Sequence, residues 1–347
     1  MALQDVLDQE KAVNILLRTI KRRRIPSAYL FAGESGVGKK FTAINLAKAL
    51  NCLKRSNAPS VITNEIDNKD LLHITHQESQ FDCCDVCSSC KKIDSGVHPD
   101  IHIISPTGGQ IRIEEIRKIE ETLSLKAFEG RWKVIIVEEA EAMNPFAANA
   151  FLKTLEEPPI NSLIILITSV PDILPETILS RCSRVNFTPL SYEACKKVIS
   201  QKSNPPLSPF DSRLSTIVRL SMGRPGLAVS TDLLEEREWF LKVLREMMKA
   251  EKDSWNSKEE MKKWLEYALI FFRDIIITKI TKEVKDIINI DIKEYIKEFG
   301  NGIDLRVIIE HYQKLNALMG FFKFNLNKSL TWNYTASLLR VLKNVKI

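Results

Sequence analysis

The 347-residue sequence lacks the features that would place it in a membrane or outside the cell. Its most apolar stretch, residues 265–280, is interrupted by Arg273 and Asp274. It is therefore not apolar enough to span a bilayer. The N-terminal residues 1–5 lack a basic region followed by an apolar core, so we expect no signal peptide. These absences favour a cytoplasmic protein with no membrane partner.

Cysteine is too unevenly placed for a secreted disulfide framework, because four of the seven cysteines crowd into residues 83–90. In a cytosolic chain such a cluster indicates a metal site. The spacing Cys-x₂-Cys-x₂-Cys lets three thiolates converge on one tetrahedral ion, with Cys83 as a spare thiol. Zinc is favoured, although the triplet alone does not separate zinc from an iron–sulfur cluster. The predicted ligands are Cys52, Cys84, Cys87 and Cys90. His98 and His102 are alternative ligands, for which we expect structural roles because four cysteines suffice.

The composition sets only broad limits on function. Hydrophobic residues make up 44% of the chain and charged residues 27%, which is ordinary for a soluble globular protein. A length of 347 residues indicates two or three domains. The net charge of +6 is a mild indication of a nucleic acid or acidic partner, and it fits a merely soluble surface equally well.

A glycine-rich stretch follows an apolar run, residues 28–31, that reads as a buried strand, and it precedes a predicted helix over residues 43–50. Glycines at 33, 36 and 38 let the backbone wrap a phosphate, and Lys39 would reach the outer phosphates. This is the P-loop pattern with one defect: Lys40 stands where a Ser or Thr hydroxyl should ligate Mg²⁺. Thr42 is the alternative source of a hydroxyl. The predicted, degenerate nucleotide site includes Gly33, Gly36, Gly38, Lys39 and Lys40.

Two further apolar strands are expected at residues 133–137 and 163–167. The first ends in Glu138 and Glu139, the Walker B arrangement, in which the first acid holds Mg²⁺ and the second polarises the attacking water. Glu138 in place of Asp is a second departure at the metal site. The other strand ends at Thr168, which we add to the nucleotide site.

Strands that alternate with helices predict a parallel sheet covered on both faces. Helices are expected over residues 5–20, 43–50, 111–120 and 144–157, and a short strand over residues 101–104. In such sheets ligands lie at the carboxyl ends of the strands, where the P-loop, Glu138, Glu139 and Thr168 all fall.

The chain resembles the bacterial replicative clamp-loader subunits, with many shared motifs over residues 10–190 and a weaker similarity to residue 230. The motifs that carry the resemblance are the P-loop, the four cysteines, His98-Pro-Asp100, Arg131-Trp-Lys-Val134, Ala140-Glu-Ala-Met-Asn144, Ala148-Asn-Ala-Phe-Leu-Lys-Thr-Leu-Glu-Glu-Pro-Pro159, Leu174-Pro-Glu-Thr-Ile178 and Ser180-Arg-Cys182.

The resemblance implies an α/β P-loop (AAA+) domain with a zinc-binding insertion, a small helical lid and an all-α C-terminal collar. The implied domains are residues 1–189, 190–230 and 231–347. Residues 54–80 read as a long polar insertion within the first domain.

Within that family, Arg181 would be an arginine finger that acts in trans on a neighbour's ATP site. Lys40, Glu138 and the loop Gly223-Arg-Pro-Gly226, which lacks a sensor-2 arginine at its fourth position, favour a subunit without ATPase activity of its own, with Glu139 vestigial. The chain would then be a stator within the replicative polymerase holoenzyme. Zinc is an expected cofactor, with ATP or ADP as a further possibility.

The implied partners are the gamma/tau and delta clamp-loader subunits, the sliding clamp through the complex, and primer–template DNA contacted through its phosphates. The alternative is an active ATPase subunit of the gamma/tau type, since Lys39 and Glu139 are intact. Cys182 should pack rather than react, because no His or Asp forms a recognisable triad with it.

Overall fold

The computed structural model describes residues 2–54, 81–202, 208, 212–249, 254–281 and 286–344. The predicted insertion lies, apart from Lys54, outside these residues. The chain divides into two compact units, one of residues 1–195 with 223–226, and one of residues 196–222 with 227–347. Each unit is described by itself, and the division into three domains stays a prediction.

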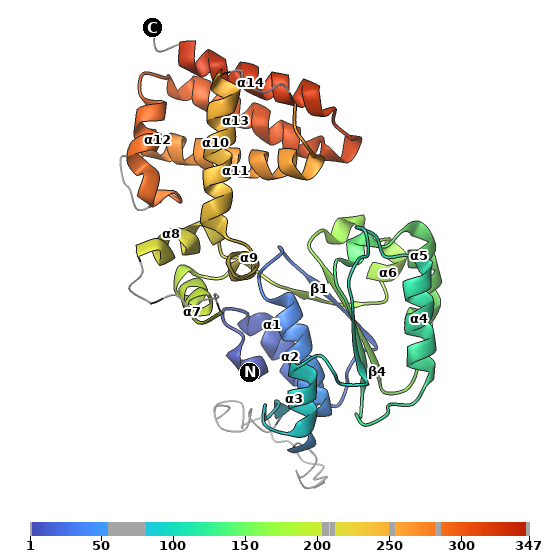
Figure 1. The fold of residues 1–347 in the computed structure, drawn as a ribbon. Helices are drawn as coiled ribbons and strands as arrows, with labels where there is room; N and C mark the ends of the chain where they lie inside the picture. The colour runs from blue at the N-terminus through green and yellow to red at the C-terminus, as the bar shows by residue number, and fades with distance from the viewer. Residues whose placement is uncertain are drawn as a thin grey trace. The chain divides into compact units, whose positions relative to one another are not determined.

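A five-stranded, fully parallel sheet in the order β2-β3-β4-β1-β5 forms the centre of the first unit (Figure 1). The strands are β1 (Ala28–Ala32), β2 (Ile101–Ile104), β3 (Lys133–Val137), β4 (Ser162–Thr168) and β5 (Ser183–Asn186). Every residue of β1, β3 and β4 is buried, as expected for inner strands of a sheet covered on both faces. The predicted parallel sheet is therefore confirmed, with β5 as an additional edge strand.

Two layers of helices cover this sheet (Figure 1). Alternate residues of the inner strands pack on α1 (Glu10–Lys21) and α2 (Lys39–Asn51) on one side, and on α4 (Ile113–Ser124) and α5 (Pro145–Glu156) on the other. The unit also contains η1 (Leu3–Asp5), α3 (Ser88–Asp94), η5 (Ala140–Ala142), η6 (Pro171–Ile173) and α6 (Glu176–Leu179). The three-layer arrangement places the loops after β1, β3 and β4 at one edge of the sheet.

The first predicted helix begins later than expected. Its periodicity extends back to Asp5, yet α1 begins only at Glu10. Asp8 adopts a left-handed backbone conformation, with φ of 55°, which a continuous right-handed helix excludes. The apolar residues before it belong instead to the short helix η1 and the loop that follows.

The second unit is all-helical, as predicted for the C-terminal region. Its elements include the end of α7 (Tyr192–Lys202), α8 (Ser212–Ser221), α9 (Pro225–Ser230), α10 (Leu233–Lys249), α11 (Lys258–Ile280), η7 (Ile290–Ile292), α12 (Lys293–Gly300), α13 (Leu305–Gly320), η8 (Phe322–Phe324) and α14 (Lys328–Asn344). Trp255, Trp264 and Trp332 lie in its core. The buried carboxylate of Asp274 accepts hydrogen bonds from the backbone N–H groups of Ile288 and Asn289, which fixes the loop before η7. Among the described helices none is both long and apolar enough to cross a membrane.

Candidate functional site

The P-loop lies between β1 and α2, as the sequence predicts. Gly38 is the N-cap of α2 with φ of 97°, a left-handed conformation that favours glycine. Lys39 begins the helix, and only 6% of it is exposed. Its Nζ donates hydrogen bonds to the backbone carbonyls of Gly33 and Glu34. The lysine that would bind phosphates is thus held by the loop itself.

The carboxylate of Glu141 lies close to this lysine and was not predicted as part of the site. Its Oε1 accepts hydrogen bonds from the backbone N–H (3.0 Å) and the hydroxyl (2.7 Å) of Ser169, while Oε2 is buried without a partner among the described residues. Burial lowers the pKa of Lys39 to about 8, and the charges of Glu141 and Glu34 counter part of that shift. Lys39 is therefore a weakly compensated buried cation.

The residue after the P-loop lysine carries an ammonium group where the P-loop pattern has a metal-ligating hydroxyl. Lys40 Nζ is 2.9 Å from Glu138 Oε2, and the hydroxyl of Ser105 donates to the same oxygen at 2.6 Å. The proposed substitute hydroxyl, Thr42, is fully buried and donates to the carbonyl of Gly38 at 3.0 Å. Because an ammonium cannot ligate a cation and Thr42 is turned inward, these residues do not fit the family's magnesium ion.

Two other residues predicted at this edge of the sheet, Thr168 and Glu139, differ in burial. Thr168 is buried at the end of β4, paired in register with Ala32, and its carbonyl accepts a hydrogen bond from the N–H of Gly33 at 3.3 Å. Glu139 is exposed and adopts a left-handed conformation, with φ of 48°, at the start of η5. The structure therefore brings Thr168 and Glu138 to the P-loop and places Glu139 in the turn beside them.

Gly226 packs directly on the P-loop. Its N–H donates to the carbonyl of Gly36 at 2.9 Å, and a Cβ at this position would lie 2.9 Å from the Cα of Gly36. The guanidinium of Arg224 lies 3.6 Å from the carboxylate of Glu34. The backbone leaves no space for a side chain at position 226, where the sensor-2 arginine of the predicted family would stand.

Arg181 lies in the turn between α6 and β5, at the surface of the unit. Its guanidinium donates to the carbonyl of Thr177 at 2.9 Å and forms an ion pair with Glu156 at 2.5 Å. The two side chains are 34% and 51% exposed, respectively. The neighbouring thiol of Cys182 is largely buried, which raises its pKa to about 12, in keeping with a packing role.

The four predicted ligand cysteines converge. The Sγ atoms of Cys52, Cys84, Cys87 and Cys90 all lie within 4.8 Å of one another, and Cys83 is not part of this group. Sulfur atoms around a tetrahedral zinc, each about 2.3 Å from the metal, are separated by about 3.8 Å, so the set fits such an ion. Burial opposes ionisation of Cys87, but hydrogen bonds from Cys90 and Leu53 outweigh it and lower its pKa to about 6. The thiolate is the form of a cysteine that can bind a metal.

A buried lysine fastens the cysteine segment to the core. Lys48 of α2 is 1% exposed, and its Nζ contacts the carboxylates of Asp85 at 2.6 Å and Asp94 at 2.9 Å. Burial alone would lower the pKa of Lys48, but the two hydrogen-bonded carboxylates raise it above its ordinary value. The segment is therefore anchored by charge as well as by its cysteines.

His98, one of the two histidines for which we expect a structural role, and the nearby Asp100 both bind parts of the fold. His98 is buried, contacts the hydroxyl of Ser89 at 3.3 Å and accepts a hydrogen bond from the N–H of Asp100 at 3.2 Å. The carboxylate of Asp100 accepts three backbone N–H bonds, from residues 128, 129 and 130, at 2.6, 2.9 and 2.7 Å. These donors hold the pKa of Asp100 below its ordinary value although burial opposes them.

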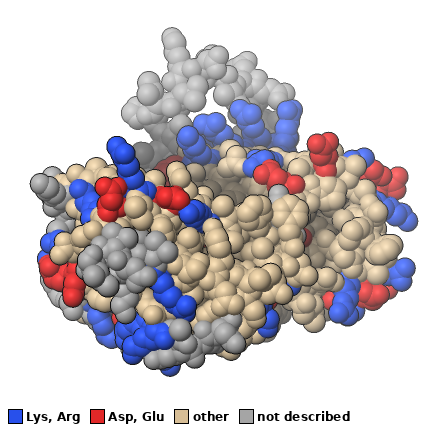
Figure 2. All heavy atoms as spheres, turned by 90° about the horizontal axis from the view of Figure 1, so that it is seen from above, with Lys and Arg blue, Asp and Glu red and all other residues tan. Residues whose placement is uncertain are grey.

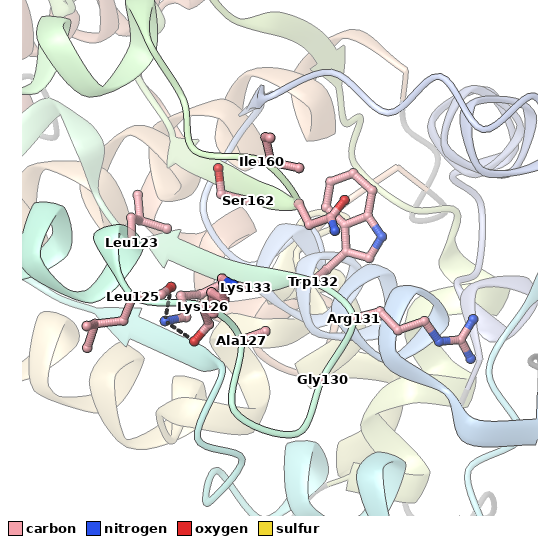
Figure 3. A pocket seen from close by; sticks show the side chains of 11 residues that line it. Leu123, Leu125, Lys126, Ala127, Gly130, Arg131, Trp132, Lys133, Ile160 and Ser162 are labelled. Atoms are coloured by element: carbon pink, nitrogen blue, oxygen red, sulfur yellow. Dashed lines mark hydrogen bonds between the residues drawn. The ribbon is translucent and has the colours of Figure 1, made fainter.

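A cavity of about 670 Å³ lies at the opposite end of the sheet, where β3 and β4 begin. In Figure 3, the amine of Lys133 points to the carbonyls of Leu125 and Lys126; it also donates to Thr122, so it closes the C-terminal end of α4. Because the cavity is at the amino ends of the strands, it is separate from the P-loop site.

Positive charge is not gathered into one track on the face that Figure 2 shows. Lys and Arg side chains of the described residues form several small groups with Asp and Glu among them, and uncharged surface lies between. This face therefore shows no continuous basic surface among the described residues.

The contacts of Glu141, Lys48 and Glu156 were missed by the sequence reasoning. Glu141 lies two residues beyond the predicted Walker B acids, and Glu156 lies within a motif that carries the resemblance. Their positions in the sequence could therefore have marked both as candidate site residues. Lys48 is one lysine among helix residues, and nothing in the sequence marks its partners, which are 37 and 46 residues away.

Comparison with known proteins identifies the relatives of this chain. Residues 8–191 match the family model described as DNA polymerase III, delta subunit. The chain is 29% identical to DNA polymerase III subunit delta' of Bacillus subtilis over 289 residues, which cover 80% of each protein. It is 33% identical to DNA polymerase III subunit tau of Escherichia coli over 189 residues, 54% of this chain and 26% of tau.

A solved structure, a gamma subunit-related protein from Thermotoga maritima, aligns with 97% of this chain and all of its own, with a TM-score of 0.45 and 19% identity. The resemblance to clamp-loader subunits, found in the motifs, is confirmed by the sequence comparisons.

Proposed function

The chain belongs to the family described as DNA polymerase III, delta subunit, and from its clamp-loader role we propose that it acts as a stator. It supplies Arg181 to the ATP site of a neighbouring gamma/tau subunit and has no hydrolytic site of its own. The proposal includes a cytoplasmic complex with gamma/tau and delta subunits that loads the sliding clamp on primed DNA. DNA contacts would be to phosphates and independent of sequence.

The observation that carries the proposal is the contrast in how the chain holds its cations. Arg181 lies at the surface, where its guanidinium donates to the carbonyl of Thr177 and pairs with the half-exposed carboxylate of Glu156, and an ion pair this exposed can be exchanged for a neighbour's phosphate at low cost. At the P-loop, by contrast, Lys40 and Glu138 pair with each other at the position of the metal. The first arrangement supports catalysis in trans, and the second argues against hydrolysis in cis.

The proposal is tested by DNA-dependent ATP turnover of the reconstituted clamp loader with Arg181→Ala. An arginine finger contributes about 10³–10⁵ to the rate at the site that it serves, so turnover should fall sharply while the complex still assembles. Arg184→Ala is the matched control, because Arg184 is exposed three residues away on β5 and its side chain donates to Asn186 of the same strand at 2.8 Å. Equal turnover of the wild type and the Arg181 variant would refute the finger.

We further propose that Cys52, Cys84, Cys87 and Cys90 hold one structural zinc ion, on the strength of their four convergent thiols. The ion would join the end of α2 to the segment that leads into α3, and its binding energy would contribute to folding. It would supply no chemistry at the P-loop, which is built from other residues.

Metal analysis of the purified protein should give about one zinc per chain, as a Cys₄ site requires. Cys87→Ser combined with Cys90→Ser should release the metal and lower the melting temperature. Cys195→Ser serves as the control, because this cysteine is buried outside the cluster. A fully folded wild-type protein that contains no metal would contradict the prediction.

A further inference from the structure

Lys40 stands in the sequence where the P-loop pattern has a metal-ligating hydroxyl, and it pairs with the acid at the end of β3. Lys40 follows the P-loop lysine directly in the first turn of α2. Its Nζ lies 2.9 Å from Glu138 Oε2, the acid that would otherwise hold the metal. Ser105 donates to the same oxygen, so the carboxylate is oriented from two sides.

We propose that this P-loop binds the polyphosphate of a nucleotide without Mg²⁺, with the Lys40 ammonium as a built-in replacement for the metal. The proposal concerns this chain's own nucleotide site and is independent of the finger at Arg181.

The chemistry of an ammonium suits this replacement. It carries one positive charge and three donors, and it makes one of its hydrogen bonds here to Glu138. The others can reach phosphate oxygens, as lysine commonly does at phosphate sites. The Lys40 side chain is 50% exposed, so its ammonium group lies at the surface of the P-loop rather than in the core.

The rest of the loop keeps what phosphate binding requires. The N-terminus of α2, a helix of 13 residues, begins at the loop, and its free N–H groups attract anions. Lys39 is a buried cation whose Nζ donates to the uncharged carbonyls of Gly33 and Glu34, and burial lowers its pKa to about 8. A polyphosphate would supply Lys39 with the negative charge that the loop carbonyls only partly provide.

Competition with magnesium follows from this arrangement. A divalent cation bound to the phosphates would meet the Lys40 ammonium at the same place and be repelled. Nucleotide complexed with Mg²⁺ in solution should therefore bind more weakly than free nucleotide, the reverse of an ordinary P-loop protein.

The test is calorimetric titration of the isolated full-length chain with ADP and with ATP, once in EDTA and once in excess Mg²⁺. Wild-type protein should bind both nucleotides in EDTA, and Mg²⁺ should weaken binding. Lys40→Met removes the charge at similar length and should weaken binding in EDTA by about tenfold or more, the worth of a charged hydrogen bond, with no rescue by Mg²⁺. Lys40→Thr supplies a metal-ligating hydroxyl and should bind only when Mg²⁺ is present.

Three results would each overturn the proposal: nucleotide binding by the wild type that requires Mg²⁺, no binding of either nucleotide under either condition, or equal affinity of the wild type and Lys40→Met in EDTA. Circular dichroism of both variants checks the fold, which should be intact because the side chain is half exposed. None of these results bears on the turnover test of Arg181, so the two proposals fail separately.

Discussion

The P-loop edge and the Arg181 turn both present cations suited to phosphate, yet the chain treats them in opposite ways. At the P-loop, Lys39 is 94% buried and held by loop carbonyls, and Lys40 is paired with the metal-binding acid. Arg181, in contrast, lies at the surface beside a carboxylate that is itself half exposed. A buried cation such as Lys39 is fixed in the fold by the groups around it, whereas an exposed ion pair such as Arg181–Glu156 exchanges partners at a cost of about 0–1 kcal/mol.

The residue type alone therefore does not decide whether a lysine or arginine can bind a phosphate; its burial and its partners also matter. Both regions carry residue types that can bind phosphate, and they differ in the groups that surround the cations: loop carbonyls and Glu138 at the P-loop, Thr177 and Glu156 at Arg181. The predictions that follow change one side of the contrast at a time, in order of decreasing expected effect.

The largest effect is expected at Lys39, where burial lowers the pKa from 10.5 to about 8. Between these values the unfolded chain holds more protons than the folded chain, so the contribution of Lys39 to stability rises with pH across that window. The free energy of unfolding of the wild type, relative to Lys39→Met, should rise by about 1–3 kcal/mol between pH 8 and pH 10.5. Urea unfolding at several pH values measures this difference. If the free energy of unfolding had the same pH dependence in both proteins, burial would not lower the pKa of Lys39 in the folded chain.

Loss of the close contact between Gly226 and the P-loop is expected to have an effect of similar size. A methyl group at position 226 would lie 2.9 Å from both the Cα and the carbonyl oxygen of Gly36, so Gly226→Ala should lower the stability by about 1–3 kcal/mol. Gly320→Ala is the control, because a Cβ at that helical position meets nothing within 4 Å and should be neutral or slightly stabilising. Differential scanning calorimetry compares the two.

A tolerated Gly226→Ala would show that the loop yields easily, and a sensor-2 arginine could then be accommodated. The expected loss of stability would mean that the backbone around position 226 accepts only glycine. The chain would then lack not only the sensor-2 arginine but also the space for it.

Much of the first unit could be predicted from sequence because its inner strands are buried on both faces and so read as unbroken apolar runs. The edge strand β5 escaped prediction, since Val185 is its one buried residue and Ser183, Arg184 and Asn186 carry no strand pattern. The start of α1 was placed too early because the backbone turn at Asp8 leaves no mark in the hydrophobic period.

In the candidate sites, too, residues close together in the sequence could be predicted and contacts between distant residues could not. The cysteines and glycines could be found because short spacings bring them together along the chain. Glu141 and Ser169, by contrast, meet only because β3 and β4 are neighbours in the sheet, and the partner of Arg181 comes from 25 residues away. Which carboxylate holds which cation depends on the packing of distant elements, and this is the property that distinguishes the two phosphate-directed sites.

The smallest effect is expected at Glu156, the exposed partner of Arg181. Glu156→Gln removes one member of a surface ion pair, so stability should change by less than about 1 kcal/mol. Turnover of the reconstituted clamp loader should be unchanged or modestly raised, because the guanidinium no longer has a competing carboxylate. Glu157→Gln is the control, since Glu157 is the adjacent exposed acid. A loss of turnover as large as that expected for Arg181→Ala, with the complex assembled, would instead make Glu156 the residue that positions the finger, and the Arg181 turn would then be as rigidly fixed as the P-loop edge.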